Sequence, residues 1–260
     1  MIKLTNFPSI KETDQNLILI PGGPGLSSQS LKHLEILKDS FNLYFVDFPG
    51  TNGNPYLGKK SFEELSDLLI DNLKEISGKI FVLGHSYGGF FAADYAIQNG
   101  CDGIICLATP FSKNSLAGAS ANYESKKTVE IIEASVEWQK NPSDKTFKNW
   151  LASYGELYFS SQKIEAGREL MLNDFSSAQF FIDNRTDSSR LESLLPALNL
   201  FTGKKLFIAG ENDGLLNRED LIEDARKGSF DFVTAENTNH FMMLDQPEIV
   251  AGLIKNYLRL

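Results

Sequence analysis

The chain has 260 residues, 42% of them hydrophobic, enough for one α/β domain with a large buried core. Its 25 Lys and Arg residues against 34 Asp and Glu residues give a net charge of −9, which disfavours nucleic acid and anionic membrane surfaces as partners. No apolar run approaches the length of a membrane span, and residues 1–8 lack the apolar centre of a signal peptide. We therefore expect a cytoplasmic protein.

The cysteines and histidines give no sign of a disulfide or a metal site. Cys101 and Cys106 fall on one predicted strand, where they would lie about 16 Å apart, too far for a disulfide. The three histidines, His33, His85 and His240, are scattered and form no zinc-binding pattern. We expect buried free cysteines, no metal and no cofactor.

The first half of the chain alternates apolar runs with helical patterns. The first 15 residues have room for one or two small edge strands. Leucines at helical spacing predict a helix capped by Ser27 or Ser28, and a capping box at Ser61 begins another. Four apolar runs predict strands buried on both faces, at residues 17–20, 43–46, 80–83 and 103–108. This alternation predicts an α/β fold with a mostly parallel sheet and right-handed crossovers.

The alternation stops at Pro110 and resumes at residue 205. Between these points we find no convincing strand, only apolar residues at helical spacing. Helices are predicted around Val129, Ile132 and Val136, then over residues 147–158, 161–172, 176–182 and 189–195, where Pro196 should end the last one. After the insertion, strands are predicted at residues 205–209 and 230–233, followed by a closing helix. We therefore predict a core domain, residues 1–110 and 201–260, with a helical lid at residues 111–200.

The sequence Gly-His-Ser-Tyr-Gly at residues 84–88 matches the G-x-S-x-G nucleophile elbow. In that motif the serine lies at a sharp strand-to-helix turn so crowded that only glycine fits two residues to either side. The pattern alone also occurs by chance in other strand–helix units. A buried strand before it and a small-residue helix after it favour a true elbow, so Ser86 is the candidate nucleophile.

A serine hydroxyl becomes a good nucleophile only when a neighbouring base takes its proton. His240 is the best candidate base, because it follows the last predicted strand, at the carboxyl edge where α/β sites form. His33 lies on the outer face of an early helix. The alternation of side chains should turn His85 away from its neighbour Ser86.

Asp213 is the candidate acid for the histidine, because it follows a strand in a glycine-containing turn and gives the expected order of serine, acid, histidine. Glu211 and Asp220 lie nearby and are rivals. Asp245 is better explained as the N-cap of the closing helix. Asp47 is interpreted as a residue that orders its own loop.

An oxyanion hole would need two backbone N–H donors. One should come from Tyr87, the residue after the nucleophile, and the other from the Pro-Gly-Gly-Pro-Gly loop at residues 21–25. Pro24 has no N–H, so Gly23 is the expected second donor and Gly22 the next choice. A plain tight turn or a phosphate-binding loop is the alternative, although the loop lacks the P-loop lysine and spacing.

The elbow at residues 84–89, Asp213 and the Asn-His-Phe sequence at residues 239–241 resemble the α/β-hydrolase superfamily over almost the whole chain. The Gly-Gly-Pro-Gly loop, the Asp47-x-x-Gly50 turn and the helical insertion resemble its proline iminopeptidase-like branch. Members of that branch include aminopeptidases, esterases and lactone-cleaving enzymes. Two positions depart from it: Pro21 stands where the branch usually has histidine, and Asn52 replaces a common glycine.

These features predict a serine hydrolase that cleaves a small, partly apolar ester or amide through an acyl-enzyme, using Ser86, His240 and Asp213. An esterase is favoured over a prolyl-type aminopeptidase; a lactonase and a non-catalytic ligand receptor with this fold are alternatives. An aminopeptidase would need buried lid acids for the substrate ammonium, and the candidates are Glu124, Glu130, Glu133, Glu137, Glu156, Glu165 and Glu169. The lid also has aromatic residues that favour helix packing over a ligand wall: Phe147, Trp150, Tyr154, Tyr158, Phe180 and Phe181.

Overall fold

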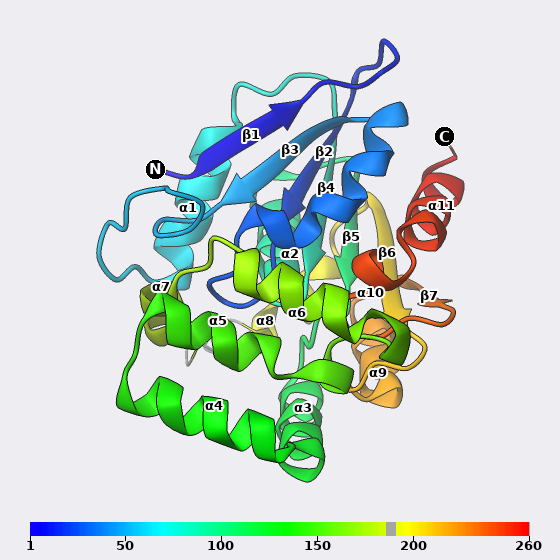
Figure 1. Ribbon diagram of the computed structural model, residues 1–260. Coiled ribbons are helices and arrows are strands. Elements are labelled where there is room, and N and C mark those ends of the chain that lie inside the picture. The colour runs from blue at the N-terminus through cyan, green and yellow to red at the C-terminus, as the bar shows by residue number, and fades with distance from the viewer. Residues whose placement is uncertain (186–190, 260) are drawn as a thin grey trace.

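A computed structural model describes residues 1–185 and 191–259, built around a seven-stranded sheet of order β1-β3-β2-β4-β5-β6-β7 (Figure 1). Neighbouring strands are parallel except for the edge pair β1–β3, which is antiparallel. The strands are β1 (Lys3–Phe7), β2 (Gln15–Ile20), β3 (Asn42–Asp47), β4 (Lys79–His85), β5 (Gly103–Leu107), β6 (Lys204–Gly210) and β7 (Asp231–Ala235). The predicted α/β fold with a mostly parallel sheet is confirmed.

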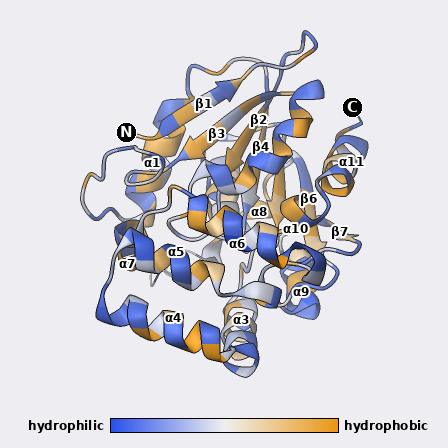
Figure 2. Cartoon of the chain, viewed as in Figure 1, coloured by the Kyte–Doolittle hydropathy of each residue, from blue (hydrophilic) through white to orange (hydrophobic). Residues whose placement is uncertain are grey.

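Helices cover both faces of this sheet, whose strands are strongly hydrophobic (Figure 2). On one face η1 packs against α11, and on the other α2 packs against the sheet with α1 and α8 beside it. These and the remaining core helices are η1 (Ser28–Asp39), α1 (Phe62–Leu73), α2 (Gly88–Asn99), α8 (Leu191–Leu198), α9 (Arg218–Lys227), α10 (Met242–Asp245) and α11 (Pro247–Leu258). Among the described residues, no helix is long and apolar enough to cross a membrane.

The two helices predicted early in the chain differ in type. The capping box at Ser61 is present, with the Ser61 side chain accepting from Glu64 N–H and the Glu64 side chain accepting from Ser61 N–H. The helix capped by Ser27 is a 3₁₀-helix rather than an α-helix. Its buried leucines are three residues apart, a spacing that aligns side chains on a 3₁₀-helix.

In the described part of the chain, six helices and two short 3₁₀ turns lie between β5 and β6, where the sequence predicts five helices and none over residues 113–126. They are α3 (Lys113–Lys126), α4 (Val129–Lys140), α5 (Asp144–Ala152), η2 (Gly155–Leu157), η3 (Ser161–Lys163), α6 (Ile164–Asn173), α7 (Ala178–Asn184) and α8. In Figure 1, α4, α5 and α6 lie to one side of the sheet. α8 instead packs against α2 and α9, in the helical layer of the core.

Three details of this helical insertion correct the sequence prediction. The helix predicted over residues 147–158 ends at Ala152, because Gly155 has a φ of 49° and the chain turns there. Pro196 lies inside α8 instead of ending it. On α4, Val129 and Val136 are exposed, whereas Trp138 is buried and packs on other aromatic rings.

Among the described residues, no group of three His, Cys, Asp or Glu side chains is arranged to hold a metal ion. Cys101 and Cys106 are both free thiols. Burial is the main reason that the pKa of each thiol is raised, to about 12 for Cys101. Both cysteines therefore stay uncharged and act as packing residues.

Candidate active site

Ser86 lies at the turn between β4 and α2 with a backbone φ of 49°. Its backbone N–H donates to the Leu107 carbonyl oxygen at 2.8 Å, which ties the turn to β5. A non-glycine residue in this left-handed region is strained, and such strain is concentrated at functional sites. The turn therefore has the backbone geometry that the predicted elbow requires.

The glycines on either side allow the strand and helix to approach each other. A Cβ atom on Gly84 would lie 2.3 Å from the Gly88 carbonyl oxygen. A Cβ atom on Gly88 would lie 2.3 Å from the Ile20 carbonyl oxygen of β2. Neither position has room for a side chain, so both glycines of the motif are required by packing.

Asp213 and His240, predicted as acid and base, form a direct pair. His240 Nδ1 donates to Asp213 Oδ2 at 2.9 Å, and both side chains are almost fully buried. Asp213 Oδ1 accepts the backbone N–H groups of Leu215 and Leu216, each at 2.9 Å. Because Nδ1 carries the proton that faces the carboxylate, Nε2 of the neutral ring is left as a proton acceptor.

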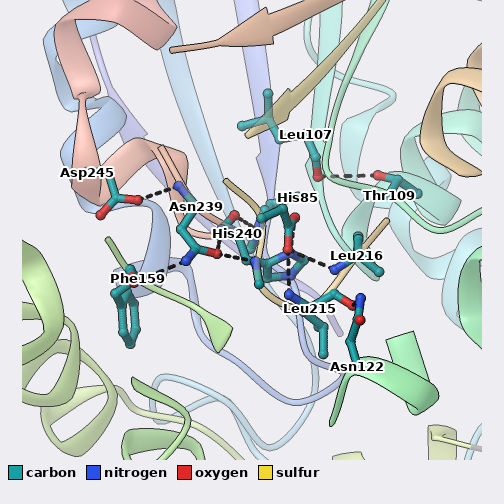
Figure 3. Close-up of polar contacts among 12 residues, drawn as sticks. His85, Leu107, Thr109, Asn122, Phe159, Leu215, Leu216, Asn239, His240 and Asp245 are labelled. Atoms are coloured by element: carbon teal, nitrogen blue, oxygen red, sulfur yellow. Dashed lines mark hydrogen bonds and ion pairs between the residues drawn. The ribbon is translucent and has the colours of Figure 1, made fainter. Parts of the chain in front are cut away.

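Asn239, for which no separate role was predicted, fixes the loop that carries His240. Its Oδ1 accepts from the N–H groups of Gly214 and His240, each at 2.7 Å. Its Nδ2 donates to the carbonyl oxygens of Glu156 and Phe159 in the helical insertion. Figure 3 shows Asn239 between His240 and Phe159. One amide thus joins three segments of the chain around the Asp213–His240 pair.

Asp245 was wrongly predicted to be the N-cap of the closing helix. The N-cap of α11 is Gln246, which makes no side-chain capping bond. Asp245 is buried, and its Oδ2 accepts the Asn239 N–H at 2.7 Å (Figure 3). Its Oδ1 accepts from both the N–H and the hydroxyl of Ser160. Asp245 therefore supports the histidine loop through Asn239 and connects that loop to the insertion.

His85 is fully buried and contacts the histidine loop. Its Nε2 lies 3.0 Å from the His240 carbonyl oxygen and must donate, because a carbonyl only accepts. Burial lowers the pKa of His85 well below its usual range, so the ring is neutral. Ring centroids of His85 and His240 are 5.0 Å apart. His85 thus helps to position the His240 backbone.

Ser86 opens into a cavity of about 460 Å³ between the sheet edge and the helical insertion. Gly23 and Tyr87, the predicted oxyanion donors, line this cavity beside Ser86. Gly22, the next choice, instead lies against His85 and Ser86: a Cβ atom there would be 2.9 Å from His85 Nδ1. The cavity wall is therefore consistent with Gly23 as the second donor.

The rivals of Asp213 lie elsewhere. Glu211 is exposed and accepts the Asn237 N–H at 2.8 Å. Asp220 accepts from the Asn217 side chain at 3.1 Å. The hydrogen bonds of these two carboxylates go to other partners, whereas that of Asp213 goes to His240.

The aromatic residues of the insertion divide between packing and the cavity wall. Phe147 and Phe180 are fully or almost fully buried in the core. The other four line the Ser86 cavity: Trp150, Tyr154, Tyr158 and Phe181. The ring of Tyr158 also stacks on that of His240, with centroids 5.4 Å apart and planes 21° apart. These aromatic residues therefore serve both in helix packing and as part of the cavity wall.

Two buried carboxylates order the loops beside the cavity. Asp47 accepts from Ser28 N–H and hydroxyl and from the Asn52 amide, in line with its expected loop-ordering role. Asp174, from the helical insertion, accepts the Ser27 N–H at 3.0 Å and the Ser27 hydroxyl at 2.6 Å. Ser27 follows the glycine loop, so Asp174 couples the insertion to the expected oxyanion donor.

We expect the stability of the protein to depend on pH through Asp174. Burial raises its pKa to about 7, with the nearby charge of Asp47 contributing, although the bonds from Ser27 oppose the shift. The folded state therefore binds this proton more tightly than the unfolded chain, whose aspartate pKa is about 3.9. The resulting stability is fully present below about pH 4 and is lost as the pH rises to about 7, amounting to up to about 4 kcal/mol.

Asp174→Asn removes this titration and keeps one acceptor for Ser27 N–H. Chemical denaturation between pH 4.5 and pH 8 should show wild type losing stability relative to Asp174→Asn as the pH rises. Buried His85 titrates in both proteins and cancels in the comparison. Parallel stability curves would show that Asp174 has an ordinary pKa.

The elbow-like turn, the buried acid–histidine pair and the order of strands together define an α/β-hydrolase type of protein. The chain belongs to the alpha/beta hydrolase family, whose family model matches residues 17–253.

Individual relatives are distant. The chain is 23% identical to a proline iminopeptidase, PfmaB, of Pestalotiopsis fici, over 93% of this chain and 91% of the relative. Its structure is similar to that of a thermophilic esterase from Thermogutta terrifontis, with a TM-score of 0.69, 21% identity, and coverage of 99% of this chain and 93% of the esterase. A proline iminopeptidase from Mycobacterium smegmatis gives a TM-score of 0.70 at 16% identity, covering 99% and 94%. At these identities the structural likeness concerns the fold.

Proposed function

We propose that the protein is a serine hydrolase that cleaves a small, partly apolar ester. The observation that carries this proposal is the His240–Asp213 hydrogen bond of 2.9 Å, which leaves Nε2 of His240 ready to accept the proton of Ser86. Ser86 has the strained backbone of an activated nucleophile and faces a cavity of suitable size for a small substrate.

In the proposed reaction, Ser86 Oγ attacks the substrate carbonyl carbon while His240 Nε2 takes the hydroxyl proton. Asp213 stabilises the imidazolium that forms. The backbone N–H groups of Gly23 and Tyr87 donate to the developing oxyanion. His240 then gives its proton to the leaving alcohol, and an acyl-enzyme remains. Water, deprotonated by His240, attacks the acyl carbon, and the carboxylic acid leaves as the Ser86 hydroxyl is restored.

An ester is favoured over a peptide with a free amino end because of the acids around the cavity. Among the described residues that line it, Glu124 is the one carboxylate. Its side chain is 64% exposed and forms an ion pair with Lys127. An ammonium group bound in a mostly apolar cavity would need buried, unpaired carboxylates. The similarity to proline iminopeptidases keeps aminopeptidase activity as the second candidate.

Labelling with a fluorophosphonate probe tests the nucleophile. Wild type should be labelled and Ser86→Ala should not, because the probe reacts only with an activated serine. Initial rates on p-nitrophenyl acetate and butyrate, compared with prolyl and alanyl arylamides, then distinguish the two candidates. We expect the esters to be the faster substrates. A folded wild-type protein that is not labelled would contradict the proposal and favour a ligand receptor.

A further inference from the structure

Three tyrosines of the helical insertion form a cluster on the wall of the Ser86 cavity. Tyr123 lies on α3, whereas Tyr154 and Tyr158 follow α5. The ring centroids of Tyr123 and Tyr154 are 5.5 Å apart, and those of Tyr154 and Tyr158 are 4.4 Å apart. Residues distant in sequence thus bring three phenol groups to one side of the cavity.

The hydroxyl groups of this cluster are available as donors. Trp150 Nε1 donates to the Tyr123 oxygen at 3.3 Å, so the hydroxyl proton of Tyr123 remains for another acceptor. Within residues 1–185 and 191–259, the hydroxyls of Tyr154 and Tyr158 have no hydrogen-bond partner in the protein, and neither oxygen is fully enclosed, so both can be reached from the cavity. An acceptor on a bound molecule would complete the set.

The charge state of the cluster restricts what it can bind. Burial is the first cause that raises the pKa of Tyr154 and Tyr158, and the charge of Asp213 adds to the shift of Tyr158. Both phenols therefore stay protonated and donate.

The two charged residues on the cavity wall give it no net charge that would favour an anion. Glu124 and Arg185 both line it, and their charges are opposite. The Arg185 guanidinium lies over the Phe181 ring, 5.7 Å from its centroid. The electrostatic effect of Asp213 on Tyr158 means that a substrate carboxylate beside Tyr158 would be repelled. An uncharged carbonyl oxygen accepts the same hydrogen bonds without that cost.

We propose that the hydroxyls of Tyr123, Tyr154 and Tyr158 bind an uncharged carbonyl oxygen of the substrate, separate from the carbonyl that Ser86 attacks. The rest of the wall is mainly apolar, with Phe90, Leu116 and Leu215 among its residues. The substrate class is therefore an apolar ester that carries a second carbonyl group, such as a keto ester. This inference rests on the proposed serine hydrolase function.

Matched substrate pairs test the inference. In one pair the keto group is on the acyl half: p-nitrophenyl levulinate against p-nitrophenyl valerate. In the other it is on the alcohol half: p-acetylbenzyl butyrate against p-ethylbenzyl butyrate. In at least one pair, wild type should show a kcat/KM at least about tenfold higher for the keto ester, because its second carbonyl oxygen gives the tyrosine hydroxyls an acceptor that the analogue lacks. Tyr154→Phe and Tyr158→Phe should each reduce that ratio to below about threefold.

The design separates the possible results. Phenylalanine keeps the ring of Tyr158 on His240, so the variants remove hydroxyls alone. Tyr44→Phe, on β3 and outside the cavity wall, is the matched control and should keep the wild-type ratio. Three results would overturn this inference but not the proposed function. They are hydrolysis of the valerate with no preference for the keto ester, a keto-ester preference unchanged in both variants, and faster hydrolysis of p-nitrophenyl succinate than of the levulinate. Failure to hydrolyse any of these esters would overturn the proposed function with it.

Discussion

Ser86→Ala is expected to lower kcat/KM for ester hydrolysis by about 10⁴-fold to 10⁶-fold and to leave the fold intact. The bond from the backbone N–H of residue 86 to the Leu107 carbonyl oxygen does not involve the side chain. Alanine and serine both carry a Cβ atom, so the strain of a φ of 49° is similar in both. Only the attacking oxygen is lost.

Steady-state kinetics and thermal denaturation of the purified variant check this expectation. Ser125→Ala is a matched control, because its hydroxyl donates only to the Asn122 carbonyl oxygen on the exposed face of α3. It should retain wild-type kinetics. Turnover by Ser86→Ala within tenfold of wild type would exclude Ser86 as the nucleophile. A large fall in melting temperature would instead show that the hydroxyl supports the fold.

The sheet could be predicted because its strands are short apolar runs, and such runs leave few alternatives once they alternate with helices. Helix ends and faces were harder to predict. On α4, the pattern of Val129, Ile132 and Val136 marks a helix, yet these three are exposed and Ile131 and Trp138 are buried. Periodicity identifies a helix, but the partner that packs on it decides which stripe is covered.

In the candidate site, too, some residues could be predicted from local sequence and others depend on tertiary packing. Ser86, Asp213 and His240 were predictable because each follows a strand of a parallel sheet, and the carboxyl ends of such strands share one edge. The residues that support them were not. Asn239 reaches a carbonyl group 83 residues away, and Asp174 reaches a serine 147 residues away. No local pattern reports such contacts, because they depend on how the insertion sits on the core.

Asp245 shows how a local pattern can mislead. An aspartate shortly before Pro247 and Glu248 has the sequence of a helix start, and capping is the usual role of that arrangement. In the folded chain its carboxylate is buried and accepts three hydrogen bonds from Asn239 and Ser160. The tertiary fold buries this carboxylate beside Asn239 and Ser160, so it accepts from them and does not cap the helix.

Asp213→Asn is expected to lower kcat by about 10⁴-fold with little change in the fold. The asparagine Oδ1 can keep both bonds from Leu215 and Leu216 N–H, since these involve one carboxylate oxygen only. Its amide nitrogen would then face His240 Nδ1, and because an amide N–H donates, Nδ1 would have to accept. The ring proton would move to Nε2. A histidine with Nε2 protonated cannot take the proton of Ser86, so the variant retains the pair but not the tautomer that catalysis needs.

The measurement is kcat over a pH range together with fluorophosphonate labelling, and Glu211→Gln is the control. Glu211 lies two residues from Asp213, is exposed and accepts the Asn237 N–H, so its loss should change kcat less than threefold. Asp213→Asn should be labelled far more slowly than wild type, because Ser86 then lacks its base. Equal kcat values for Asp213→Asn and wild type would mean that another group orients His240. A strong loss in Glu211→Gln instead would identify that group, since Glu211 is the rival acid in the same loop.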